Sequence, residues 1–308
     1  LERLKTDMKR EMNVAKTVPQ EIAQSKFREA IFKDHPYGRY FSTEEKINSF
    51  TLQKVKDFYN KNVGAKRSTL YIAGKFDDAK VNAAVDKAFS KWRPGPDIST
   101  PPLPQMTKQG SIIIDRKDAP QTTIILGLPV IKPKETDYTA LLITNSLLGG
   151  SFGSRITSNI RENKGYTYSP FSTVQNRRLA SVWFEQADVT AEHTAASLQE
   201  IEKEIKRLQT EPPSAEELSG IQNYEAGIFV LQNSTPDGII SQIQFLNKYG
   251  LPDSYLTNKV KNMYSVTPAK VSEMAKKHFD CSKMTTVMVG DEKTIKKQIA
   301  EKAPKKGF

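Results

Sequence analysis

The sequence has little of what metal and redox sites are built from. Of its 308 residues, one is cysteine (Cys281) and three are histidine. A single cysteine excludes an internal disulfide and a cysteine-based zinc cage. No run of 18 or more apolar residues occurs, so no segment is predicted to span a membrane as a helix. The first residues (Leu1, Glu2, Arg3) offer no initiator methionine, signal peptide or helix cap, so we expect a part of a longer protein.

Positive charge is in excess, with 46 Lys and Arg against 35 Asp and Glu and a net charge of +11. Such an excess is typical of proteins that bind nucleic acid or anionic surfaces, and also of proteins that are merely soluble. Here the lysines are scattered along expected helical faces, and no arginine stripe alternates with aromatic residues. We therefore expect a solvated basic surface and no nucleic-acid partner. A basic binding protein is the least favoured alternative, and steep salt dependence of DNA binding would reveal it.

Proline divides the chain. Residues 93–110 (RPGPDISTPPLPQMTKQG) contain five of the seventeen prolines. Because proline fixes φ and lacks a backbone donor, neither a helix nor a central strand continues through this stretch. We predict a linker over residues 93–110, between a first segment, residues 1–92, and a second, residues 111–308.

The two segments contain a repeat. Residues 47–74 and 263–290 align without a gap at a constant offset of 216, and seven of the 28 positions are identical. Both copies predict a helix capped by a threonine (Thr51 or Thr267), a polar turn, and a strand that ends in glycine. The offset predicts that residues 1–92 are the C-terminal half of a first domain, and that residues 111–308 are a complete second copy. Chance similarity between helix–turn–strand units is the alternative.

The order of expected elements in the second copy indicates the fold class. Strands are expected at 112–114, 122–128, 166–174, 180–189 and 284–289. Helices are expected at 136–148, 154–163 and 191–208, then from residues 214, 252 and 268, and at the C-terminus. Strands that come in blocks beside grouped helices are typical of an α+β fold. We predict a duplicated α/β domain whose mostly antiparallel sheet has helices packed on it, with the first copy truncated.

The histidines do not form a metal motif. They are His35, His193 and His278, and no H-E-x-x-H pattern occurs. The inverted pattern H-x-x-E-H would need a histidine at position 189, before Glu192 and His193, but that residue is valine. No self-contained zinc site can be built from this set.

Arg161 and Tyr168 are the candidate site residues. Arg161 lies near the end of an expected helix, Gly165 turns the chain, and Tyr168 falls on the strand expected to follow. This geometry can bring a charged donor and a neutral donor to one place, where they could hold a peptide carbonyl or the oxyanion that develops from it. An Arg and a Tyr near a turn are also common in proteins, so a structural role stays open on these residues alone.

A resemblance adds to this interpretation. Residues 153–170 (GSRITSNIRENKGYTYSP) resemble the Arg/Tyr signature in the C-terminal domains of the pitrilysin/insulinase-like zinc metallopeptidases, the inverzincins. In that family the Arg and the Tyr stand seven residues apart, as Arg161 and Tyr168 do. Residues 34–39 (DHPYGR) and the turns at 148–150, 250–252 and 266–268 also resemble family landmarks. The similarity covers essentially the whole chain.

The resemblance implies a clamshell in which a zinc domain faces the domain that carries Arg161 and Tyr168. The family's H-x-x-E-H motif belongs to the half-domain that is absent here. Glu11 falls on the position of the family's third zinc ligand, but Leu4 stands where the family often has another acid. Glu11 is therefore either a zinc ligand of the complete enzyme or an ordinary exposed glutamate.

The resulting hypothesis is part of a zinc-dependent peptidase. In the complete enzyme, Arg161 and Tyr168 would hold a peptide or protein substrate and stabilise the intermediate, while the missing half-domain or a zinc-bearing partner subunit supplies the metal site. We expect no tightly bound zinc and no activity in this chain alone. The alternative in the same family is a catalytically inactive structural or partner subunit. The compartment is not fixed by the sequence, although a soluble protein of the bacterial cell envelope or periplasm is consistent with the resemblance.

Overall fold

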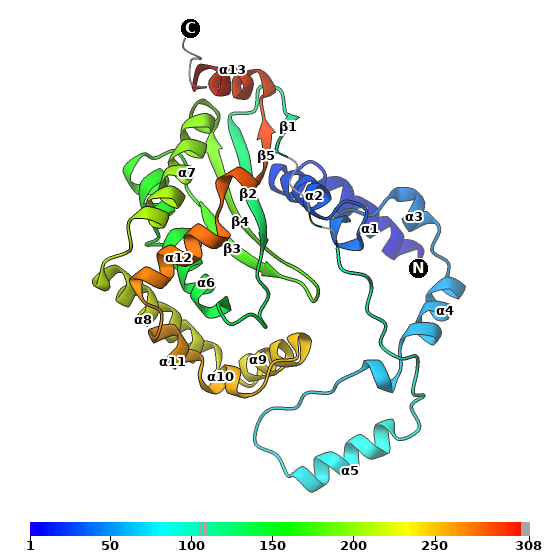
Figure 1. Cartoon of the computed structure of the whole chain (residues 1–308). Coiled ribbons are helices and arrows are strands. Elements are labelled where there is room, and N and C mark those ends of the chain that lie inside the picture. The colour runs from blue at the N-terminus through cyan, green and yellow to red at the C-terminus, as the bar shows by residue number, and fades with distance from the viewer. Residues whose placement is uncertain (105, 107–109, 303–308) are drawn as a thin grey trace.

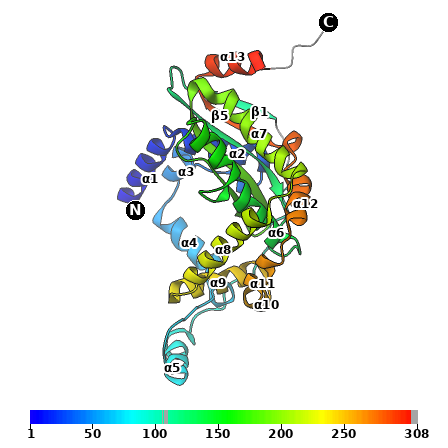
Figure 2. The same ribbon diagram turned by 90° about the vertical axis from the view of Figure 1, so that its left-hand side faces the viewer.

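A computed structural model describes residues 1–104, 106 and 110–302. The first segment is helical throughout its regular elements (Figure 1). These helices are α1 (Glu2–Ala15), α2 (Pro19–Phe32), α3 (Glu44–Asn48), α4 (Leu52–Asn62) and α5 (Asp78–Phe89). Figures 1 and 2 both show α5 lying away from the rest of the chain.

The second segment contains a five-stranded mixed sheet in the order β1–β5–β2–β4–β3. The strands are β1 (Ser111–Asp115), β2 (Gln121–Val130), β3 (Phe171–Asn176), β4 (Ser181–Thr190) and β5 (Thr285–Gly290). β1 and β5 are parallel, and the other three pairs are antiparallel. The predicted α+β class with a mostly antiparallel sheet is therefore confirmed, and β3 is an edge strand.

The helices of the second segment are α6 (Tyr138–Asn145), α7 (Thr194–Thr210), α8 (Ala215–Gln232), α9 (Pro236–Tyr249), α10 (Ser254–Thr257), α11 (Lys259–Tyr264), α12 (Pro268–His278) and α13 (Glu292–Lys302). Buried residues of α6, α7 and α12 form one apolar cluster with one face of the sheet. On this face β4 presents Trp183, Ala187 and Val189, all buried. The Trp183 ring lies 4.7 Å from the ring of Phe279. Alternate β4 residues share a face because side chains along a strand point to opposite sides.

Helix α2 packs on the opposite face of the same sheet. Phe27 and Ile31 of α2 join a buried cluster with Val182 and Phe184 of β4, and the Phe27 and Phe184 rings are 5.9 Å apart. Both faces of β4 are thus buried because both are covered. The domain boundaries 1–92, 93–110 and 111–308 stay a prediction, and residues 105 and 107–109 of the linker lie outside the described residues.

The structure bears out the helical part of the repeat. The Thr51 hydroxyl accepts from the Lys54 amide at 3.1 Å and caps α4, and the Thr267 hydroxyl accepts from the Lys270 amide at 3.2 Å and caps α12. Pro268 occupies the first turn of α12, where its missing N–H group costs no hydrogen bond.

The strand expected at the end of the first copy is absent. Residues 68–73 form no strand in the described part of the chain, whereas their counterparts in β5 are paired with β1 and β2. A strand needs neighbouring strands to satisfy its backbone groups, and no strand is described beside this segment. The repeat also differs in burial: Val55 and Phe58 of α4 are 47% and 67% exposed, whereas their counterparts Val271 and Met274 are 0% exposed.

Candidate functional site

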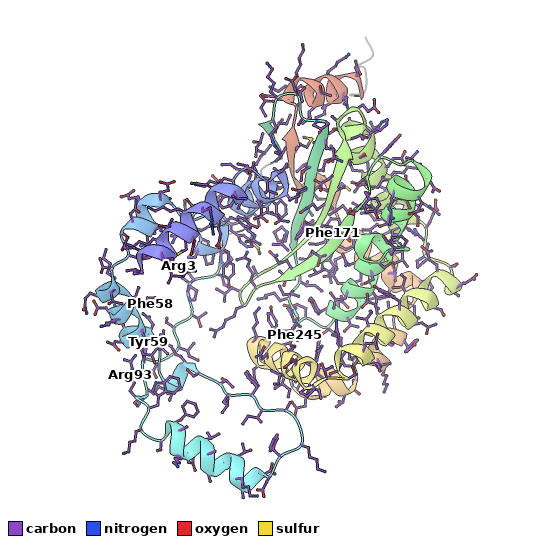
Figure 3. All side chains as sticks on the ribbon, turned by 180° about the vertical axis from the view of Figure 1, so that it is seen from behind. Arg3, Phe58, Tyr59, Arg93, Phe171 and Phe245 are labelled. Carbon is purple, nitrogen blue, oxygen red and sulfur yellow. The ribbon has the colours of Figure 1, made fainter. Side chains whose placement is uncertain are left out.

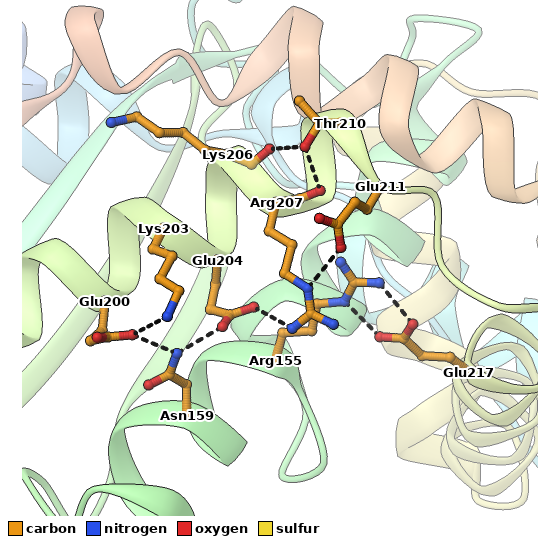
Figure 4. Close-up of polar contacts among 10 residues, drawn as sticks. All are labelled: Arg155, Asn159, Glu200, Lys203, Glu204, Lys206, Arg207, Thr210, Glu211 and Glu217. Atoms are coloured by element: carbon orange, nitrogen blue, oxygen red, sulfur yellow. Dashed lines mark hydrogen bonds and ion pairs between the residues drawn. The ribbon is translucent and has the colours of Figure 1, made fainter.

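The segment that carries Arg161 is held rigidly. Residues Thr157–Asn163 form a π-helical turn, a rare conformation that is often found at functional sites. The Asn159 amide donates to Glu200 at 2.9 Å and to Glu204 at 2.7 Å, both on α7. Arg155 makes a two-pronged contact with Glu217 of α8, at 2.7 and 2.8 Å (Figure 4). Two helices therefore anchor the turn that presents Arg161.

The position of Tyr168 differs from the prediction. The strand expected at 166–174 begins only at Phe171, and Tyr168 lies in the loop that precedes β3. Gly165 adopts φ +64°, and Pro170 has no N–H group to donate to a ladder. One isolated bridge, Thr167 with Val189, is all the pairing described for this loop.

The structure brings Arg161 and Tyr168 together. The guanidinium carbon of Arg161 lies 4.9 Å from the centroid of the Tyr168 ring and 4.4 Å from that of the Phe152 ring. Arg161 Nε also lies 3.3 Å from an oxygen of Glu162. Tyr168 is 80% exposed, which leaves its phenol open to a ligand. Sequence reasoning missed Phe152, whose position in a Gly-Ser-Phe-Gly turn gave no signal of this contact.

A shallow cavity of about 380 Å³ adjoins the pair. It is lined by Gly149, Gly150, Ser151, Phe152, Thr157, Arg161, Tyr168, Ser169, Pro170 and Phe171. Gly149 passes close to the sheet, because a β-carbon there would lie 2.6 Å from an oxygen of Glu185 and 2.7 Å from the Ser172 hydroxyl. Glu185 of β4 is fully buried, neither carboxyl oxygen has a hydrogen-bond partner among the described residues, and burial raises the pKa of this carboxyl well above its usual range.

Tyr166 has a different environment from Tyr168. Its ring is stacked on His193, with centroids 4.2 Å apart. His193 in turn lies 3.4 Å from the carboxyl group of Glu192. Tyr166 is half-buried and outside the residues that line the cavity, so it provides a matched comparison for Tyr168.

The described residues do not fit a zinc site. They contain no group of three His, Cys, Asp or Glu side chains that could hold a metal ion. Glu11 is exposed on α1 and makes no described hydrogen bond or ion pair, so its role as a ligand stays a prediction. His278 is buried, and desolvation lowers its pKa, which favours the neutral ring. No helix in the described ranges is long and apolar enough to cross a membrane.

These features define an α+β domain with an Arg/Tyr pair beside a shallow cavity. Residues 49–224, more than half of the chain, match the family described as "Peptidase M16 inactive domain". The chain therefore belongs to this family. The resemblance to zinc metallopeptidases found in the sequence is confirmed at the level of the family.

Relatives and solved structures agree with this assignment. An "Uncharacterized zinc protease" of Rickettsia felis is 28% identical over 204 residues, which cover 65% of this chain and 48% of the relative. The "Non-peptidase homolog YmxG" of Helicobacter pylori is 20% identical and covers 96% of this chain and 69% of its own length. The crystal structure of a peptidase M16 inactive domain from Pseudomonas fluorescens shares the fold, with a TM-score of 0.85 at 23% identity over 94% of this chain and 70% of that one. The chain spans about half the length of the Rickettsia relative.

Proposed function

We propose that this chain contributes substrate binding and charge stabilisation to peptide bond hydrolysis in a zinc-peptidase assembly. The observation that carries the proposal is the contact between Arg161 and the exposed ring of Tyr168 beside the cavity. A guanidinium that is always charged and a neutral phenol are complementary donors for a main-chain carbonyl.

The way Arg161 is held suits this role. Its two aromatic neighbours contact the guanidinium through ring faces, which fixes the group without using its N–H donors. The anchored π-helical turn keeps the group in place before substrate arrives. Donors fixed in advance stabilise a developing oxyanion better than donors that must reorganise.

Zinc chemistry is not assigned to this chain. A catalytic zinc needs three protein ligands, and Glu11 is the one residue here with a family counterpart among them. The proposal therefore places the metal on another half-domain or on a separate subunit. The contribution of this chain is limited to its own donors.

The apolar face of α4 supports a missing half-domain. Val55 and Phe58 occupy positions that are fully buried in the second copy of the repeat, yet they are exposed. We infer that a second half-domain or subunit with strands and helices like those of residues 111–308 covers this face. A location in the bacterial cell envelope belongs to the same proposal and would be tested by cell fractionation.

A catalytically inactive subunit is the second candidate. It is favoured by the similarity to the Helicobacter relative, which is named as a non-peptidase homologue and matches nearly the whole chain. In that case Arg161 and Tyr168 would retain a binding or packing role without turnover.

The test combines metal analysis with a peptidase assay. After dialysis the chain alone should contain well below one zinc per molecule and should not cleave a quenched fluorescent peptide. Addition of the zinc-bearing half or subunit should produce cleavage. Stoichiometric zinc that resists chelators, or cleavage by the chain alone, would contradict the proposal. Absence of cleavage with a half that does carry H-x-x-E-H would favour the inactive subunit.

A further inference from the structure

Helix α2 lies next to the sheet (Figure 1), and there the charge of Arg177 acts on Arg28 of this helix. Arg28 comes from α2, and Arg177 comes from the turn between β3 and β4, where its amide donates to the Ala180 carbonyl at 2.8 Å. Both side chains are half-buried. Burial lowers the pKa of each guanidinium, and the charge of Arg177 lowers the pKa of Arg28 further. At Arg28, burial and a like charge therefore act in the same direction.

No acceptor is described within hydrogen-bond distance of either guanidinium group. Neither Arg28 nor Arg177 forms a described ion pair, and neither side chain donates a described hydrogen bond. Arg28 Nε is buried without a partner among the described residues. Half-buried charged donors are normally paired, so this arrangement calls for an anion.

Aromatic rings hold both groups by their faces. The guanidinium carbon of Arg28 lies 4.4 Å from the Tyr40 ring centroid, and that of Arg177 lies 4.9 Å from the Tyr37 ring centroid. The Arg177 group also lies 5.7 Å from the ring of Phe32. The N–H donors of a guanidinium lie in its plane, so contacts with its face leave the edges available. A planar carboxylate matches such an edge with two hydrogen bonds.

One acid, Glu21, lies within electrostatic range. Its carboxylate accepts a hydrogen bond from the Tyr40 hydroxyl at 2.5 Å. It raises the pKa of Arg28, but it is the smallest of the four influences on that group and forms no described ion pair with it. The two guanidinium groups therefore have one acid nearby, and its carboxylate is already hydrogen-bonded to Tyr40.

The place of the pair relative to the proposed substrate site suggests its ligand. Arg177 directly follows Asn176, the last residue of edge strand β3, whereas Phe171, the first residue of β3, lines the cavity beside Arg161 and Tyr168. Six strand residues span roughly 20 Å at about 3.3 Å each. A peptide of six or more extended residues could therefore reach from one place to the other.

We propose that Arg28 and Arg177 form a carboxylate-binding site that anchors the peptide substrate at a distance from the Arg161/Tyr168 pair. The carboxylate is either the C-terminus of the peptide or an acidic side chain, since both have the same chemistry. This inference rests on the proposed function, because it assumes a peptide ligand.

The experiment measures binding of fluorescent ten-residue peptides to the full chain by anisotropy. One peptide has a free C-terminus and no acidic side chain, a second has an amidated C-terminus, and a third is amidated with one glutamate near its end. At least one carboxylate peptide should bind about tenfold more tightly than the amidated neutral peptide, and Arg28→Gln or Arg177→Gln should abolish the difference. Arg178→Gln, at the exposed neighbouring arginine, should preserve it. Which peptide gains affinity identifies the source of the carboxylate.

Two further readouts separate the possible failures. Equal binding of all three peptides by the wild-type chain, or an equal loss in Arg178→Gln, would overturn the carboxylate site. Arg161→Ala reports on the proposed function instead, through weaker binding of the amidated neutral peptide. Each Gln substitution removes one of two like charges and also contact between a guanidinium and an aromatic ring, so its two effects on the melting temperature oppose each other. A lower melting temperature together with intact carboxylate preference would assign the pair a structural role and overturn the inference.

Discussion

Replacement of Glu217 by alanine should destabilise the segment that presents Arg161. Glu217 accepts two hydrogen bonds from Arg155 and forms part of the polar network in Figure 4. The Arg155 side chain is 9% exposed, so removal of its partner leaves a mostly buried charge uncompensated. The hydroxyl of Ser214 also caps this first turn of α8, by accepting from the Glu217 amide, and this bond survives the substitution.

The magnitude follows from the partial burial of the pair. Loss of one partner from a fully buried ion pair costs about 3–5 kcal/mol, whereas exposed pairs contribute about 0.2–1 kcal/mol. Because the Glu217 side chain is 33% exposed, we expect an intermediate cost of about 2 kcal/mol. For a domain of this size that corresponds to a melting temperature lowered by about 4–8 °C.

The assay is urea unfolding of Glu217→Ala beside Glu216→Ala. Glu216 is exposed in the same first turn, so its replacement removes the same charge without the Arg155 contact. The Arg155 hydrogen bond lowers the pKa of Glu217, so the stabilisation is present above the unfolded pKa of about 4.3 and is lost as pH falls through the lower folded value. Two results would refute this reasoning. One is a loss of unfolding free energy that agrees within about 0.5 kcal/mol between the two variants. The other is a difference in unfolding free energy between wild type and Glu217→Ala that does not become smaller at acid pH.

Two further predictions concern buried positions. Burial raises the pKa of Glu185 in the folded protein, so wild-type stability should fall as pH rises from about 4.3 toward this raised pKa. Glu185→Gln cannot ionise and should gain stability relative to wild type between pH 4.5 and 7.5. A difference in unfolding free energy between the two proteins that stays constant over this range, measured by urea unfolding, would contradict this. Met274→Ser should lower the free energy of unfolding by about 2–5 kcal/mol because Met274 is buried. Phe58 (labelled in Figure 3) occupies the matching position of the first copy and is exposed, so Phe58→Ser should lower it by less than about 0.5 kcal/mol. Equal losses would mean that α4 is already covered.

Local signals in the sequence were enough for most of the fold. Thr51 and Thr267 mark helix starts because their hydroxyls satisfy amides three residues later. The prediction of a strand over residues 68–73 was wrong because strand formation depends on neighbouring strands, which a local sequence pattern does not reveal. The strand predicted at 166–174 begins only at Phe171, because Pro170 has no N–H group to donate to a ladder.

Among the candidate site residues, too, some contacts follow from the local sequence and others depend on tertiary packing. Arg161 and Tyr168 are seven residues apart around Gly165, so their proximity follows from local geometry. Arg28 and Arg177 are separated by 149 residues (177 minus 28), and their approach depends on how α2 packs on the sheet. No periodicity in either segment could have revealed that pair.

The central claim is that Arg161 and Tyr168 act on the substrate carbonyl once the chain is combined with its zinc-bearing half. The most direct measurement is kcat and kcat/KM for peptide hydrolysis by Tyr168→Phe, with Tyr166→Phe as the matched control. Loss of one oxyanion donor typically lowers the rate by about 10²–10³, so Tyr168→Phe should lower kcat and kcat/KM alike with KM little changed. Tyr166→Phe should be nearly silent. Wild-type turnover in Tyr168→Phe and in Arg161→Ala would contradict the claim and leave the inactive-subunit interpretation.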